Sequence, residues 1–378
     1  MSQTFENLAQ RGIHYFLAAM PAFRAAKSQS VPAKDQESAY NFIKSIYEKL
    51  YADPALLGLK TLPDDCLAEW WTPKKEKPGL PEKIRGNIKS VNLFMEALYS
   101  IVYLGKQKGD AIALAKEDHE LKPAVLKHFG NFDISVTKED EAYTFAFPKG
   151  IVDGLKLLAM ISTVHAQRAD PTLHSRPMCH FTLFSHGVFD PQAPYTAEIF
   201  KRIIQNDDAF DKLIDYFTQH NFVRLDNKEY KTGIKGDLTT LDYVKFYGKP
   251  EGTIGFAWKT RNFCGIEFTY NELIKSGMTI GLHIPFFSEV MEKSDQMDES
   301  LKEFLGCFNK CSGCRYCVQL DKTKTKPLKV VKVGNSSLCA VFTFGFTFNN
   351  LGDNMWVADG IIELMEFVDR VLADRRAQ

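Results

Sequence analysis

Four of the eight cysteines in this 378-residue chain lie within one short segment, 307–317. From Gly306 the segment reads Gly-Cys-Phe-Asn-Lys-Cys-Ser-Gly-Cys-Arg-Tyr-Cys, so three, two and two residues separate successive cysteines. Thiolates held this close together are typical of a shared soft metal ion, and a two-residue gap lets the chain turn both sulfurs toward one centre. The segment therefore predicts a metal site formed by Cys307, Cys311, Cys314 and Cys317.

The remaining cysteines are scattered through the sequence, at Cys66, Cys179, Cys264 and Cys339. This distribution indicates a ligand cluster with separate core thiols, and it does not fit a disulfide framework. The first residues lack the basic start and apolar run of a secretory signal. No segment reaches the roughly 18 apolar residues that a membrane span requires. We therefore expect a cytoplasmic protein without a membrane segment.

A closed zinc site is the first expectation for the four-cysteine segment, because zinc is commonly held by four tetrahedral thiolates. All four ligands would come from the protein, so no coordination position would remain for water. Such a site is structural, and it would stabilise a locally irregular part of the fold.

A [4Fe-4S] cluster is the alternative. The stretch 311–317, Cys-Ser-Gly-Cys-Arg-Tyr-Cys, resembles the first three ligands of the bacterial ferredoxin motif, which continues with a fourth cysteine and a proline. Here Asp321 stands at the fourth position, so Cys307 or Cys339 would have to complete a cluster. The spacing in 307–314 also resembles the cluster loop of radical S-adenosylmethionine enzymes. It follows a predicted helix, however, and too little chain remains beyond it for that family's barrel.

The charge balance gives no general attraction to nucleic acid, since Lys plus Arg and Asp plus Glu each number 47. Five lysines between 322 and 332 form a local basic strip. Their alternation favours an edge strand protected by lysines, and no aromatic residues interleave with them as in single-strand binders. Nucleic acid is therefore not an expected partner.

Apolar periodicity divides the chain into two parts. Three- and four-residue intervals predict helices at 13–20, 38–50, 84–102 and 122–129. Beyond 131, alternating segments predict strands at 133–137, 143–147, 180–184, 242–247, 252–258, 265–269, 278–284, 328–333 and 338–346. Helices in the same part are predicted at 150–166, 195–205, 209–220, 298–307 and 354–375. The prediction is an α+β fold: a helical N-terminal region, 1–130, then a region, 131–378, of mixed, mainly antiparallel sheets packed with helices and containing the short four-cysteine metal loop, 307–317. Similar strand-to-helix patterns at 143–158 and 341–364 fit two independent units better than a duplication.

Two further groups of residues are candidates for a binding site. Trp70 and Trp71 are adjacent in a long proline-containing connection, 52–81, where large aromatic side chains line a pocket or fill the base of the helical part. His174, His180 and His186 recur at six-residue intervals around Cys179. No metalloenzyme signature accompanies them, which favours ordinary surface or core histidines.

The sequence contains no dinucleotide-binding fingerprint, phosphate loop, nucleophile elbow or kinase signature. With a closed ligand set and neutral charge, the first hypothesis is a metal-stabilised intracellular protein that binds a small molecule or another protein. The alternative hypothesis is an iron-sulfur or zinc enzyme that uses the cysteines in redox or hydrolytic chemistry.

Overall fold

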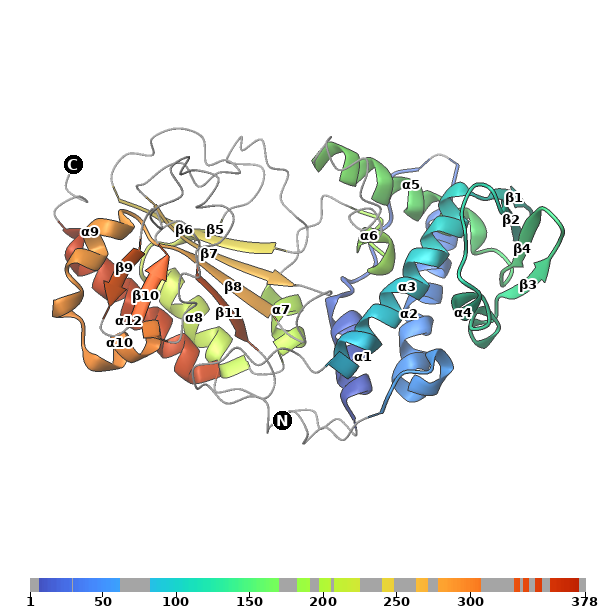
Figure 1. The fold of residues 1–378 in the computed structure, drawn as a ribbon. Helices are drawn as coiled ribbons and strands as arrows, with labels where there is room; N and C mark the ends of the chain where they lie inside the picture. Colours follow the sequence, from blue (N-terminus) through green and yellow to red (C-terminus); the bar gives the residue numbers. More distant parts are fainter. Residues whose placement is uncertain are drawn as a thin grey trace, which may run out of the picture.

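Two hydrophobic cores organise the chain, and each contains helices packed against antiparallel strands. The computed structural model describes residues 7–28, 30–61, 82–169, 182–190, 197–204, 207–224, 240–247, 263–270, 278–306, 330–333, 336–339, 344–348 and 354–373. Figure 1 shows two lobes, one built from the blue and green half of the sequence and one from the yellow and red half.

The first lobe is mainly helical. Its helices are α1 (Leu8–Ala19), α2 (Ala33–Ala52), α3 (Glu82–Leu104), α4 (Pro123–Leu126), α5 (Val152–Ala169) and α6 (Thr182–Ser185), with the 3₁₀ helices η1 (Pro54–Leu57) and η3 (Phe129–Phe132). The apolar stripes read from the sequence are the buried faces: Ile43, Ile46 and Leu50 of α2 are fully or almost fully buried. Asn7 caps α1, since its side chain accepts a hydrogen bond from the Gln10 amide at 3.0 Å.

A four-stranded sheet closes this lobe. Its order is β1 (Lys106–Lys108), β2 (Ala111–Ala115), β4 (Ala142–Ala146) and β3 (Ser135–Lys138), and every pair is antiparallel. Ile112, Leu114 and Phe145 share one face, which is buried in the helical core.

The crossing of α5 over α2 depends on a glycine. A Cβ atom at Gly154 would lie 2.4 Å from the Asp35 carbonyl oxygen and 2.7 Å from the Ala39 Cβ. The two backbones can approach this closely only because Gly154 has no side chain.

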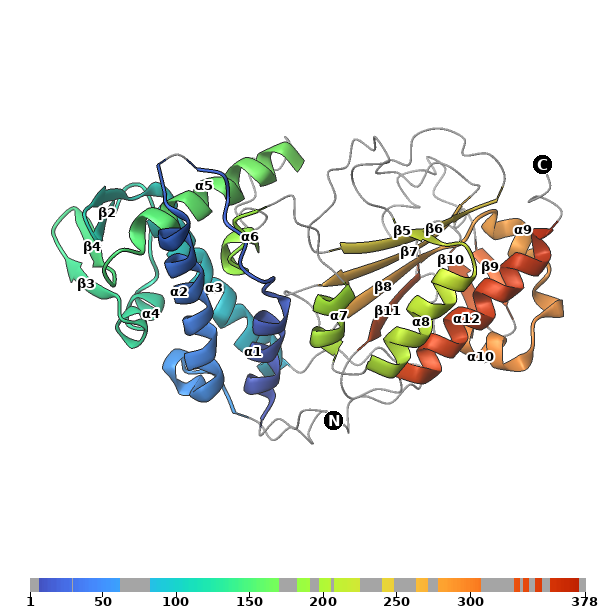
Figure 2. The ribbon, with the colours of Figure 1, turned by 180° about the vertical axis from the view of Figure 1, so that it is seen from behind.

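The second lobe contains a five-stranded antiparallel sheet, a hairpin and several helices. The sheet order is β11 (Phe344–Phe348), β8 (Met278–His283), β7 (Phe263–Tyr270), β6 (Thr240–Phe246) and β5 (Val223–Arg224). The hairpin pairs β9 (Val330–Val333) with β10 (Ser336–Cys339). The helices are α7 (Ala197–Ile204), α8 (Asp207–Gln219), α9 (Phe287–Glu292), α10 (Glu299–Gly306) and α12 (Asn354–Val371), with the 3₁₀ helix η6 (Ser294–Gln296). In Figures 1 and 2, α8 and α12 lie side by side along one side of the sheet.

Helix α1 joins the two lobes, because its buried residues Tyr15, Ala18 and Ala19 belong to the core of the second lobe. It packs against α7, where the ring Nε2 of His14 is hydrogen-bonded to the Arg202 carbonyl oxygen at 3.1 Å. The lobes therefore meet through apolar packing as well as polar contacts.

The α+β fold class and the antiparallel strand arrangement are confirmed within the described residues. Helices were found in each of the predicted segments, although the element in 122–129 is a single turn, α4. None of the described helices combines the length and apolar character needed to cross a membrane. The division at residue 130 stays a prediction, and the sheet β1–β4 has strands on both sides of it.

Some local predictions were wrong. The strand expected at 180–184 is contradicted by α6, a helical turn, and His186 lies in the turn that follows it with its side chain buried. The single strand expected at 338–346 is two strands, since β10 pairs with β9 and β11 pairs with β8. The hairpin of β1 and β2 was not predicted. The strand expected at 252–258 lies outside the described residues.

Candidate functional site

The five-stranded sheet of the second lobe has two chemically different faces. Residues paired across antiparallel strands share a face, and neighbours along a strand alternate between faces. Lys245 pairs with Cys264, and Tyr243 pairs with Ile266, which pairs in turn with Leu282. Apart from Lys245, these residues belong to the second lobe's hydrophobic core, which also contains buried residues of α12. They therefore lie on the face of the sheet that the helices cover.

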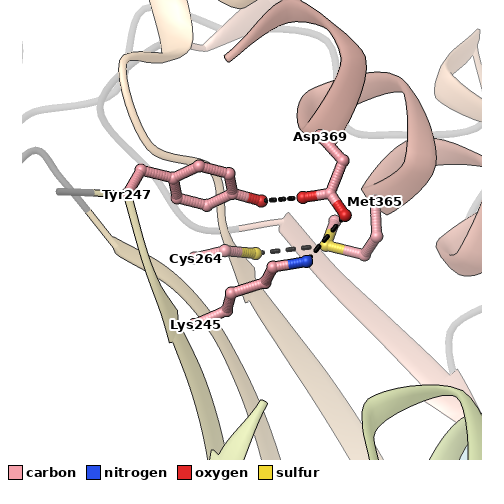
Figure 3. Close-up of polar contacts among 5 residues, drawn as sticks. All are labelled: Lys245, Tyr247, Cys264, Met365 and Asp369. Carbon is pink, nitrogen blue, oxygen red and sulfur yellow. Dashed lines mark hydrogen bonds and ion pairs between the residues drawn. The ribbon is translucent and has the colours of Figure 1, made fainter. Parts of the chain in front are cut away.

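A buried ion pair lies on this helix-covered face (Figure 3). The Lys245 ammonium is 2.6 Å from the Asp369 Oδ2 atom of α12, and the two side chains are 8% and 17% exposed. The Tyr247 hydroxyl donates to the other carboxylate oxygen, Oδ1, at 2.6 Å. Both oxygens of Asp369 thus accept hydrogen bonds, which meets the requirement for holding a charged pair away from water.

The groups around the ion pair make this cluster unreactive. Cys264 is buried, and its sulfur lies 3.1 Å from the Met365 sulfur, one helical turn before Asp369. Burial, followed by the nearby Asp369 charge, raises the pKa of the Cys264 thiol far above its ordinary value, so it stays protonated. The Lys245 ammonium also lies 5.3 Å from the centre of the Phe222 ring. The arrangement holds α12 on the sheet and offers no thiolate nucleophile.

The opposite face of the same sheet carries threonines, glycines and two acidic residues, and also Val223, Val244, Phe246 and Phe263. One row across it consists of threonines, Thr240, Thr269, Thr279 and Thr347. In the next row Asp242 pairs with Glu267, Glu267 with Gly281, and Gly281 with Gly345. In the third row Val244 pairs with Gly265, and Gly265 with His283. This polar face, with Asp242, Glu267 and His283 on three neighbouring strands, is the strongest candidate for a binding surface.

The predicted metal ligands Cys307, Cys311, Cys314 and Cys317 lie outside the described residues. The elements before and after their segment are described: α10 ends at Gly306, β9 begins at Val330, and α10 packs against β9. The hairpin register places Cys339, the last residue of β10, directly opposite Val330. The described residues on either side of the segment therefore belong to neighbouring elements.

Among the side chains that the structure describes, no group of three or more histidine, cysteine, aspartate and glutamate residues is placed to hold a metal ion. Of Asp242 and Glu267, the structure describes the backbone pairing of β6 with β7.

Some of the other candidate residues from the sequence lie within the described residues and some lie outside them. Trp70 and Trp71 lie outside the described residues, as do His174 and His180. His186 is fully buried, as expected of a core histidine. Trp356 packs edge-on against Phe304 with ring centres 5.3 Å apart.

Comparison with family models, with curated proteins and with solved structures found no match to this chain. Function therefore has to be argued from the residues themselves. The sequence did contain the signal for the polar face, because Asp, Glu, Thr and Gly alternate with apolar residues in β6, β7 and β8. What it lacked was the register that places these residues in shared rows.

Proposed function

We propose that this protein is a cytoplasmic binding protein in which the four-cysteine segment holds a structural zinc ion and the rest of the chain binds a small molecule or another protein. The observation that carries the proposal is the cysteine spacing in 307–317. Four thiols in so few residues supply a complete tetrahedral ligand set without any other part of the chain.

The neighbouring elements support a structural role for this ion. Since α10 and β9 contact each other, the described residues on either side of 307–329 are held together by the fold. A metal ion that links the cysteines would restrain this segment, and its binding energy would add to the stability of the second lobe.

The test is metal analysis of the full chain purified without oxygen or chelators. We expect about one zinc ion per chain, a ratio that follows from four thiolates forming one tetrahedral site. The purified protein should be colourless, with no absorption band in the visible range. Cys314→Ser should lose the zinc, whereas Cys66→Ser, which changes a cysteine far from the segment, should keep it. Wild-type protein without metal would refute the proposal.

An iron-sulfur or zinc enzyme is the second candidate function. It is favoured by the ferredoxin-like run 311–317 together with the position of Cys339, which the hairpin register places opposite Val330, the first described residue after the cysteine segment. A brown protein with broad visible absorption would favour this candidate over structural zinc. In that case Cys339→Ser and Cys307→Ser would be compared, and the variant that loses the brown colour would identify the fourth ligand of the cluster.

The ligand can be sought independently of the metal. A thermal-shift screen of metabolites against the zinc-loaded protein detects any compound that binds only the folded state. If compounds of one chemical class raise the melting temperature of the protein, they define the class of its small-molecule ligand. If no compound raises it, a protein partner is favoured.

A further inference from the structure

Helix α10 ends directly before the first cysteine of the four-cysteine segment, and it packs against α12 (Figure 2). Its residues Leu301, Phe304 and Leu305 are at most 1% exposed and belong to the core of the second lobe. A helix of eight residues is marginal in water on its own, so this packing is what keeps α10 in place. The packing therefore also fixes the position of Gly306, the last described residue before Cys307.

The contact between α10 and α12 is built around the Phe304 ring. The ring centre lies 5.3 Å from that of Trp356, and the two rings meet edge to face at 72°. One turn further along α12, a Cβ atom at Gly360 would overlap the Cγ, Cδ2 and Cε2 atoms of the same ring. The ring can lie here only because residue 360 has no side chain. Beside it, the Ser300 hydroxyl donates a hydrogen bond to the Glu363 carboxylate at 2.8 Å.

The described residues that follow the cysteine segment depend on the same helix. Strand β9 begins at Val330 and contacts α10. Val333 of β9 is 1% exposed and lies in the same core as Phe304. The described residues before and after the segment are therefore positioned together, by α10 and its packing on α12.

We propose that metal binding by the four-cysteine segment is coupled to the packing of α10 on α12, with the Phe304 contact as the coupling element. This inference rests on the proposed function, because it requires the segment to bind a metal ion. The first ligand, Cys307, directly follows α10, so an ion that fixes this cysteine disfavours states in which α10 leaves α12. Linkage is reciprocal, so loosening α10 must weaken metal binding by the same factor.

Gly360→Ala tests the coupling without changing any cysteine. The added Cβ displaces the Phe304 ring, and Phe304→Leu weakens the same contact without overpacking it. The apparent zinc dissociation constant of the full chain is measured by competition with a chromophoric chelator. We expect both variants to bind one zinc ion at least about fivefold more weakly than the wild type, the lower end of ordinary coupling between two sites.

The matched control is Gly154→Ala. Its added Cβ also meets close neighbours, but they belong to α2 in the first lobe. It should lower the melting temperature as Gly360→Ala does and leave the zinc dissociation constant of the folded protein unchanged.

Trp356 gives a second readout, because its ring touches Phe304. Removing zinc with a chelator should change the tryptophan emission of the wild type, and adding zinc back should restore it. Trp356→Phe keeps an aromatic ring beside Phe304 and should show a smaller change than the wild type.

The coupling is overturned if Gly360→Ala and Phe304→Leu bind zinc as tightly as the wild type, since the segment would then bind its ion independently of α10. It is also overturned if Gly154→Ala weakens zinc binding as much as Gly360→Ala, or if Trp356→Phe shows the full emission change. In these cases the zinc itself would stand. A wild-type protein that binds no metal would refute the proposed function and the coupling together.

Discussion

Replacing Asp369 with alanine tests whether the buried ion pair holds α12 on the sheet. Lys245 is 8% exposed and its ammonium is 2.6 Å from the Asp369 carboxylate. Alanine would leave that ammonium buried without the carboxylate and would remove the acceptor of the Tyr247 hydroxyl. Breaking a buried pair from one side costs about 3–5 kcal/mol, so we expect the free energy of unfolding to fall by about 4 kcal/mol.

Replacing both partners together tests the pair as a unit. Lys245→Met combined with Asp369→Leu removes both charges and fills the space with apolar atoms, which is neutral or stabilising by about 1–4 kcal/mol in other buried pairs. We therefore expect the double variant to recover most of the stability lost in Asp369→Ala. Urea unfolding followed by circular dichroism measures all the variants.

The matched control is Asp359→Ala, on the same helix. Asp359 forms an ion pair with Lys212, and both side chains are about half exposed, at 52% and 47%. An exposed pair is worth about 0–1 kcal/mol, so this variant should be nearly as stable as the wild type. The reasoning is refuted if Asp369→Ala costs no more than Asp359→Ala, or if the double variant is as unstable as Asp369→Ala.

Three other substitutions test the packing and the lobe contact. Gly154→Ala should lower the melting temperature, because overpacking costs about 1–3 kcal/mol and the obstructing atom belongs to the Asp35 backbone. Gly12→Ala in α1 has nothing within 4 Å of the added Cβ and should raise the melting temperature, because alanine adds up to about 1 kcal/mol of helix propensity. Burial is the largest cause of the lowered pKa of His14 in the folded protein. As the pH falls, His14 in the unfolded chain therefore binds a proton before His14 in the folded protein does. Stability should therefore fall as the pH drops below about 6.5, the ordinary His pKa, and a His14→Gln variant should lose less between pH 7.5 and 5.5 in urea unfolding; parallel losses would contradict the assignment.

The elements that were predicted correctly from the sequence are those whose apolar spacing along the chain is enough to define a helix or a strand. The stripe from Val91 to Val102 is helical and buried because its apolar spacing matches one face of a helix. The β1–β2 hairpin was missed although Ile112 and Leu114 alternate with alanines, since alanine is a helix former and hides a strand pattern. The helical turn at 182–185 was mistaken for a strand because its aromatic and β-branched residues occur in strands as well as in short helices. Its packing against α3 and α5 selects the helical conformation.

The candidate sites differ in how far sequence alone could define them. The cysteine segment is visible in the sequence because its ligands are close along the chain. Asp242, Glu267 and His283 are separated by long connections, so only the strand register places them in neighbouring rows. The ion pair of Lys245 with Asp369 is hidden for the same reason, since its partners come from β6 and α12.

The two faces of the sheet are linked through this register. A one-residue slip of a strand would exchange its two faces and move Asp242 toward the helices and Lys245 away from them. The contact of Lys245 with Asp369 therefore also fixes which residues form the opposite face.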